Sequence, residues 1–372
     1  MDYLTNYGSA ERVVPQRALR LPLSLVQKRP QKGTHGVIIG GRIFTAETER
    51  GVYYRDERTL KETLVYGDAR IMSGVMAASE SGFLVERETA EGVGGGIVSV
   101  AIPSLDVSVV CTESPIRRAA TWGGPGFAIL CLTEGLKALL GRFESGDCQA
   151  VWTLPYGEFA VAENRVIVRV RRRPAVVSAD LESGEILWER SFEELGLSPG
   201  GGGTPRRGQT AAGYPHVFGD VIVLPGHSQQ LAGLDLESGQ RIWSHQTRGD
   251  AHFPVVYVDG RVYKVSGEFL TVLDARTGQV VVEERVQLPP ETPSDAREMS
   301  VTFSDVADGY VFTGTRQGLL LVLNAQTANV EWMDVLEDEP QAEGSLISGN
   351  RLYVWAGDHA YIYDGQGGFS PD

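Results

Sequence analysis

Residues Ala179–Trp188 read ADLESGEILW, and residues Leu234–Trp243 read LDLESGQRIW. Each stretch has an aspartate, then a serine and a glycine three and four residues later, and a tryptophan at its end. An aspartate side chain accepts hydrogen bonds from the backbone of a tight turn, and glycine adopts the positive φ that such a turn requires. The residues after the turn alternate between apolar and polar, so each copy predicts a turn followed by a β-strand.

Weaker copies of this turn occur along the rest of the chain. They are Leu273–Gly278, Leu323–Ala328, Tyr363–Gly365 and Arg55–Leu60, together with turns near Pro103 and near Glu144–Gly146 that fit by spacing. The anchor of each copy then falls near residues 56, 101, 142, 180, 235, 274, 324 and 364. Steps of roughly 38 to 55 residues match the size of one four-stranded propeller blade.

These repeats predict an all-β fold, an eight-bladed β-propeller of four-stranded antiparallel blades, with seven blades as the alternative. Two-residue turns such as Asp259–Gly260 join the first two strands of a blade. The segment Leu19–Val26 is expected to supply the missing outer strand of the last blade and so close the ring, and a disordered arm is the alternative.

We expect one domain over residues 1–372. Its expected parts are an N-terminal arm and closing strand at 1–30, blades at 31–372, and inserted loops at 193–212 and 286–298 that enlarge one face. The first loop contains four consecutive glycines, which predict a mobile flap or a plain linker. The second is rich in proline and is expected to be stiff.

The repeated D-x-x-[ST]-G-x-x-x-W pattern resembles the PQQ-like repeat of quinoprotein dehydrogenases. It is also similar to the repeats of the outer-membrane-protein assembly lipoprotein that shares their fold. The resemblance covers nearly the whole chain and is strongest from about residue 150 onward. It implies an eight-bladed propeller, but it does not imply a quinone, because these repeats mark the architecture rather than the chemistry.

Quinoprotein dehydrogenases resemble one another in a pair of adjacent cysteines, a tryptophan platform and a calcium site. The three cysteines here, Cys111, Cys131 and Cys148, are not adjacent. Trp152, Trp188, Trp243 and Trp332 fall in expected outer strands, where tryptophan docks one blade against the next, while Trp122 and Trp355 lie nearer the axis. We therefore expect no cofactor; PQQ is disfavoured, and a histidine-bound metal ion is a minor alternative.

Composition limits the partners. The formal net charge of −14 disfavours nucleic acid, because an acidic surface repels phosphate. No apolar stretch is long enough to cross a bilayer, and the N-terminus lacks the pattern of a secretory signal. We expect a cytoplasmic protein without membrane contact, while the oligomeric state stays open.

Five of the six histidines are expected on one propeller face, where the fourth-to-first and second-to-third strand connections meet. They are His35, His216, His227, His252 and His359, whereas His245 falls in an outer strand. Other polar residues predicted for the same rim are Arg117, Arg118, Tyr156, Glu158, Arg206, Arg207, Tyr214, Arg316 and Glu343. Histidine there can bind a ligand, act in proton transfer, hold a metal, or simply be solvated.

Three functions remain open at this stage. The first is a binding module that holds a protein or a small molecule at the mouth of the central channel. The second is a cofactor-independent enzyme with His216 and His252 as acid and base and Glu158 or Glu343 orienting them. The third, quinone-dependent oxidation, requires a bound chromophore. The binding module is the favoured hypothesis, because the sequence predicts a platform more strongly than it predicts chemistry.

Overall fold

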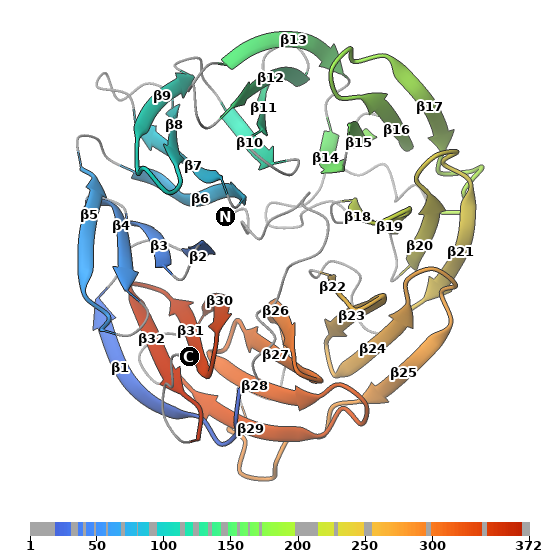
Figure 1. The fold of residues 1–372 in the computed structure, drawn as a ribbon. Helices are drawn as coiled ribbons and strands as arrows, with labels where there is room; N and C mark the ends of the chain where they lie inside the picture. Colours follow the sequence, from blue (N-terminus) through green and yellow to red (C-terminus); the bar gives the residue numbers. More distant parts are fainter. Residues whose placement is uncertain are drawn as a thin grey trace. The chain divides into compact units, whose positions relative to one another are not determined.

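The computed structural model describes residues 19–30, 36–39, 42–47, 50–56, 59–67, 71–79, 81–88, 95–111, 116–121, 126–132, 136–142, 148–154, 157–162, 164–170, 173–197, 215–226, 230–248, 255–294, 299–336 and 341–366. The regular elements of these residues are all β-strands (Figure 1). They form eight four-stranded antiparallel sheets. The chain groups into two compact units, residues 1–10 with 32–191 (unit 1) and residues 11–31 with 192–372 (unit 2).

Unit 1 contains four sheets, and in each the chain runs from the first strand to the fourth without a crossover. The sheets are β2 (Gly36–Ile39), β3 (Arg42–Glu47), β4 (Gly51–Asp56) and β5 (Glu62–Tyr66); β6 (Ile71–Ser79), β7 (Gly82–Glu88), β8 (Gly95–Ala101) and β9 (Val107–Cys111); β10 (Ile116–Thr121), β11 (Gly126–Leu132), β12 (Leu136–Arg142) and β13 (Cys148–Leu154); and β14 (Gly157–Ala162), β15 (Arg165–Val170), β16 (Ala175–Asp180) and β17 (Ile186–Ser191).

Unit 2 also contains four sheets. They are β18 (His216–Phe218), β19 (Val221–Pro225), β20 (Gln230–Asp235) and β21 (Arg241–Gln246); β22 (Val256–Val258), β23 (Arg261–Ser266), β24 (Phe269–Asp274) and β25 (Val280–Arg285); β26 (Val301–Ala307), β27 (Tyr310–Thr315), β28 (Leu319–Asn324) and β29 (Val330–Val335); and β30 (Ala342–Ser348), β31 (Arg351–Ala356) and β32 (His359–Asp364), to which β1 (Ser24–Pro30) adds the fourth strand.

The sequence anchors are confirmed. The third strand of every sheet ends at an anchor, at residues 56, 101, 142, 180, 235, 274, 324 and 364. At Asp274 the carboxylate Oδ1 accepts hydrogen bonds from the Thr277 backbone N–H (2.8 Å) and the Thr277 hydroxyl (2.7 Å). Asp180 and Asp235 bind Ser183 and Ser238 in the same way. The aspartate therefore fixes the turn that leads into the outer strand.

The expected hairpin between the first two strands is also confirmed. Asp259 and Gly260 join β22 to β23 with φ of +50° and +73°, and Asp308 and Gly309 join β26 to β27 with φ of +51° and +78°. Two consecutive positive φ angles define the two-residue turn whose twist matches that of paired strands.

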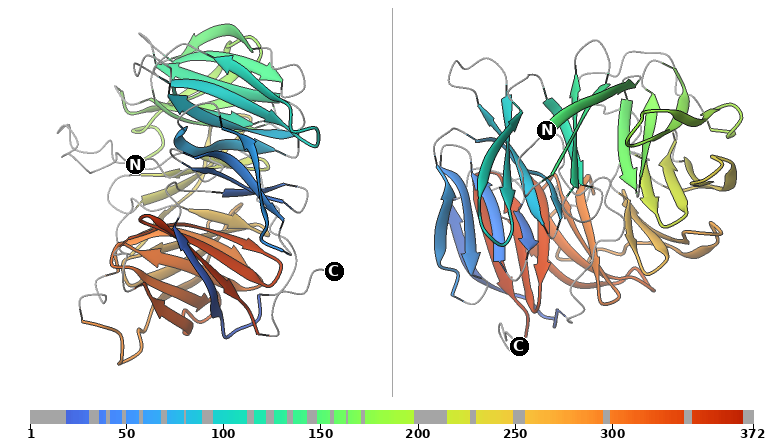
Figure 2. Two further views of the ribbon diagram at one scale, coloured as in Figure 1. Left: turned by 90° about the vertical axis from the view of Figure 1, so that its left-hand side faces the viewer. Right: turned by 45° about the horizontal axis from the view of Figure 1, so that its top comes forward.

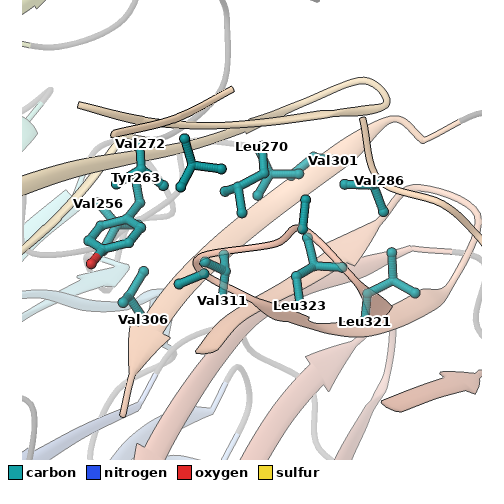
Figure 3. Packing of buried hydrophobic residues seen from close by; sticks show 14 of the residues in the cluster. Val256, Tyr263, Leu270, Val272, Val286, Val301, Val306, Val311, Leu321 and Leu323 are labelled. Atoms are coloured by element: carbon teal, nitrogen blue, oxygen red, sulfur yellow. The ribbon is translucent and has the colours of Figure 1, made fainter. Parts of the chain in front are cut away.

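Apolar side chains fill the space between neighbouring sheets. Figure 3 shows the cluster between β22–β25 and β26–β29, where Tyr263 and Val272 of one sheet face Val311 and Leu323 of the next. These side chains are at most 8% exposed. The sheet β26–β29 is apolar on both faces, because its other face packs against β30–β32 in a second cluster, as expected of a propeller blade.

The N-terminal strand completes the last sheet of unit 2, as the sequence predicts. β1 pairs antiparallel with β32, from Ser24 opposite Asp364 to Pro30 opposite His359, and Figures 1 and 2 show the two strands side by side. The strand lies later than the expected Leu19–Val26. Leu19 and Leu23 are instead buried against the sheets of unit 2 before the strand begins.

Part of the second expected insertion has a described position. Residues after β25 run along β29, the outer strand of the following sheet, and the enlargement of one face by this loop stays a prediction. Gln287 forms a parallel bridge with Asn329, and the Thr292 hydroxyl contacts the Met333 sulfur at 3.4 Å. The physical reason is that the buried Val286 and Thr292 anchor this segment in the cluster beside β29.

Candidate functional site

The candidate site lies in unit 2, between the sheets β18–β21 and β22–β25. Val221 and Val223 of the first sheet pack against Val255 and Val262 of the second, and Trp243 packs into the same cluster. In an antiparallel sheet, residues directly opposite one another share a face. His216 is opposite Val223, and Phe218 is opposite Val221, so both side chains face the second sheet. We call this contact between the two sheets the seam.

Three rings form a ladder across the seam. His216 and Phe218 of β18 stack with ring centroids 5.9 Å apart and an interplanar angle of 17°. Phe218 stacks in turn on Tyr257 of β22, at 4.2 Å and 12°. We call these three residues the aromatic platform. All three residues are partly buried.

Burial lowers the pKa of His216 to about 4. Desolvation disfavours the charged imidazolium, so the ring is neutral near pH 7. A neutral ring can stack on an aromatic partner and still offer one hydrogen-bond donor and one acceptor. It is poorly suited to donate a proton at neutral pH, since an efficient general acid has a pKa close to the working pH.

A buried amine lies in the same seam. Lys264 of β23 shares a face with Val262, and its Nζ donates a hydrogen bond to the Thr247 hydroxyl at 2.7 Å. Both side chains are almost completely buried. Thr271 of β24 is opposite Lys264, and its buried hydroxyl oxygen has no hydrogen-bond partner. The part of the seam that contains Lys264, Thr247 and Thr271 is therefore polar, although the cluster beside it is apolar.

The side chains of three predicted site residues are described. His216 begins β18, a first strand, as expected. His359 is the first residue of β32 rather than part of the loop before it, because it pairs with Ala356 of β31 and with Pro30 of β1; its ring lies 6.3 Å from that of Tyr361. Arg316 follows β27 and is exposed. His216 and His359 thus contact different rings.

Other predicted residues are described only through the backbone. Arg117 and Arg118 lie in β10, Glu158 in β14 and Glu343 in β30, each of which is the first strand of its sheet. The pairing of Glu158 or Glu343 with a histidine stays a prediction. Outside the described residues lie His35, Tyr156, Arg206, Arg207, Tyr214, His227 and His252.

Sequence reasoning missed Phe218, Tyr257 and Lys264. The available signal was the alternation of side chains between the two faces of β18 and of β22, counted from the two-residue turn that follows each strand. This alternation assigns Phe218 and Tyr257 to opposite sides of one seam. That assignment depends on the register of both hairpins, and a shift of one residue moves every side chain to the other face.

The described residues include three of the tryptophans in docking roles. Among the described residues, no group of three or more His, Cys, Asp or Glu side chains lies close enough to share a metal ion. Trp152, Trp243 and Trp332 donate their indole N–H to the backbone oxygens of Leu181, Ala275 and Leu23 at 2.9, 2.8 and 3.1 Å. These rings dock one sheet against the backbone of the segment that follows in the next sheet, as the sequence predicts. They are therefore not available to stack on a quinone. No helix in the described part of the chain is long and apolar enough to cross a membrane.

Solved structures share this architecture at low sequence identity. The structure of BamB from Moraxella catarrhalis superposes with a TM-score of 0.64 and 14% identity, over 92% of this chain and 100% of that one. The computationally designed Ika8 protein matches with a TM-score of 0.65 and 13% identity, over 92% and 98%. Sqt1 from Saccharomyces cerevisiae matches at 0.61 and 11%, over 93% and 98%. The fold is a β-propeller of four-stranded antiparallel blades.

Sequence comparison gives the family. The dehydrogenase subunit of a quinone alcohol dehydrogenase from Gluconacetobacter polyoxogenes is 26% identical over 44% of this chain. This chain spans only 25% of the length of that relative. The family described as outer membrane protein assembly factor BamB matches residues 137–368, which is more than half of the chain. The protein therefore belongs to this family of PQQ-like-repeat β-propellers.

Proposed function

We propose that the protein is a binding module that holds a partner protein at the aromatic platform. The observation that carries this proposal is the continuous stack of His216, Phe218 and Tyr257 across two neighbouring sheets. Aromatic rings supply a large contact area at a small cost in conformational entropy, which is why they are enriched at binding hot spots. The family description, an assembly factor, names a role in protein assembly for its members and supports a protein as the partner.

The charge state of the platform also supports binding. His216 is neutral near pH 7, because burial lowers its pKa to about 4. An apolar or aromatic side chain of the partner can cover the platform without burying an unpaired charge, which would be costly.

We further propose that each of the eight sheets is one propeller blade. The support is their common four-stranded antiparallel build, which β1 completes in the last sheet of unit 2. In a propeller the first strand of a blade is its inner strand, so β18 and β22 carry the platform at the inner edge of their two sheets. Location in the cytoplasm stays a prediction of the sequence.

Site-specific photo-crosslinking in cells tests the binding function. A photoreactive phenylalanine analogue replaces Tyr257 in one variant and, in the control, Tyr310, a partly buried tyrosine of the next sheet, β26–β29. We expect one discrete protein adduct from position 257 and none from position 310. With the captured partner purified, Tyr257→Ala and Phe218→Ala should each weaken its affinity about 30-fold, as hot-spot truncations do.

Two outcomes would contradict the proposal. The first is a partner whose affinity is unchanged in both alanine variants. The second is the absence of a protein adduct together with a small metabolite that raises the unfolding temperature of the wild type but not of Tyr257→Ala. That second outcome would make the ligand a small molecule.

A further inference from the structure

A second feature of the seam lies away from the platform, where the two outer strands meet. His245 of β21 is two residues after Trp243 and therefore shares the face that packs against the next sheet. Its Nε2 lies 3.2 Å from the Oε1 of Glu283 in β25. The side chains of His245 and Glu283 are only 17% and 18% exposed. This is the contact between a histidine and a carboxylate that joins the two sheets.

Glu283 is held from several sides. Its Oε2 lies 3.5 Å from the Nε of Arg248, whose guanidinium also covers the ring of Phe269 at 5.6 Å. Glu283 is opposite Thr271, which in turn is opposite Lys264. A carboxylate, a hydroxyl and an ammonium therefore form a row across one face of the second sheet, and His245 closes that row from the first sheet.

Few charged side chains among the described residues face His245 from the elements packed around it. β25 contributes Glu283 and Arg285, but Arg285 is paired with Glu268 at 2.6 Å. β23 contributes the ammonium of Lys264, and the segment after β21 contributes Arg248. β20 places the apolar Leu231 opposite His245. Glu283 is the negative group in contact with the imidazole of His245. The positive charges of Lys264 and Arg248 partly oppose the protonation of that ring.

We propose that His245 and Glu283 form an acid-strengthened latch that tightens the seam as the pH falls from about 8 to about 5.5. Imidazole is the side chain that ordinarily gains its proton between pH 5 and 8. At high pH the neutral ring makes a hydrogen bond with the carboxylate. Once protonated it makes an ion pair with the Glu283 carboxylate, a charge-assisted contact that is stronger than the neutral one. The latch is therefore strongest in mild acid and is weakened as the pH rises.

The latch goes beyond the proposed function, because it concerns how firmly two blades hold together and does not depend on any partner. It still has a consequence for the platform, since the same two sheets carry His216, Phe218 and Tyr257. A seam that opens less often in acid presents the stacked rings in one geometry for a larger fraction of the time.

Backbone hydrogen exchange followed by mass spectrometry tests the latch in the intact protein. Peptides covering β21 and β25 are compared at about pH 5.5 and about pH 8, after correction for the intrinsic pH dependence of exchange, with β29 of the same chain as the internal reference. In the wild type we expect exchange of β21 and β25 to slow in acid about two- to fivefold relative to β29, the range for a partly exposed ion pair.

Two variants separate the latch from a general effect of pH. His245→Gln keeps a hydrogen-bonding side chain that does not titrate, and Glu283→Gln removes the negative partner while leaving the imidazole. Each should abolish the acid-dependent slowing, so either one suffices if the other fails to fold. The proposal is overturned if the wild type shows no slowing, or if a folded variant keeps all of it.

Discussion

The turns after β24 and β28 occupy equivalent places in neighbouring sheets, yet they are built differently. After β24, Gly278 has φ of +68°, and a Cβ there would meet the ring of Trp243 at 2.5 Å. After β28, Ala328 stands at the equivalent position with φ of +57°. The turn with Gly278 faces Trp243 of the preceding sheet. At the equivalent position of β25, the strand that precedes the turn with Ala328, the residue is Val282, and Ala328 packs in the same cluster as Val282.

The difference shows what requires glycine in this repeat. A positive φ alone is tolerated, because Ala328 adopts it, as do Leu60 and Leu105 in the weaker copies of unit 1. Glycine is required where a tryptophan of the preceding sheet lies on the turn and donates its indole N–H to the carbonyl of Ala275. The tryptophan and the glycine are therefore two halves of one contact.

The largest expected effect comes from breaking this contact with Gly278→Ala. The new Cβ is both in a strained backbone region and inside the van der Waals radius of the indole, so we expect a loss of about 3 kcal/mol in the free energy of unfolding. Gly260→Ala is the matched control, since Gly260 has φ of +73° but no atom within 4 Å of the added Cβ. It should cost only about 1 kcal/mol. Guanidinium unfolding measures both, and equal losses would show that backbone strain, not the tryptophan, sets the requirement.

A smaller effect is expected from moving the contact into the other sheet. Val282→Trp should destabilise the chain by about 1 to 3 kcal/mol, because the indole meets the Cβ of Ala328. Adding Ala328→Gly should return at least about 1 kcal/mol, since the ring then lies on the turn with its N–H near Ala325, the equivalent of Ala275. Ala328→Gly alone should change stability by less than about 1 kcal/mol, because relief of strain and loss of a methyl contact oppose each other. A double-mutant cycle measures the coupling, and additive effects would count against the two-part contact.

The same comparison shows how far the sequence determines the structure. Asp274 and Asn324 are local signals, because the turn that each one caps is made by residues within five positions of it. Six of the eight anchors carry such a signal, whereas those near residues 101 and 142 follow from the spacing of the others. The position of residues 286–294 could not be predicted in this way, because their partners Asn329 and Met333 lie about forty positions away along the chain. The platform required knowing which faces of two hairpins meet. Phe218 and Tyr257 are unremarkable within their own strands and become a site only through their stacking.

The smallest expected effect concerns the caps of the two turns and their response to acid. The hydroxyl and backbone N–H of Thr277 donate to Asp274 and hold the pKa of that carboxyl below its usual range. A depressed pKa in the folded chain means that this stabilisation is complete above the unfolded pKa of about 4 and is lost as the pH falls below it. Asn324 makes its cap with an uncharged amide oxygen and contributes no such dependence. Asp274→Asn should therefore cost about 0.5 kcal/mol at pH 7, a small value because the turn is exposed to solvent. Unfolding midpoints of wild type and variant, measured from about pH 7 down to about pH 2.5, should converge in acid. A constant difference across that range would mean that the charge of Asp274 adds nothing to its geometry as a cap.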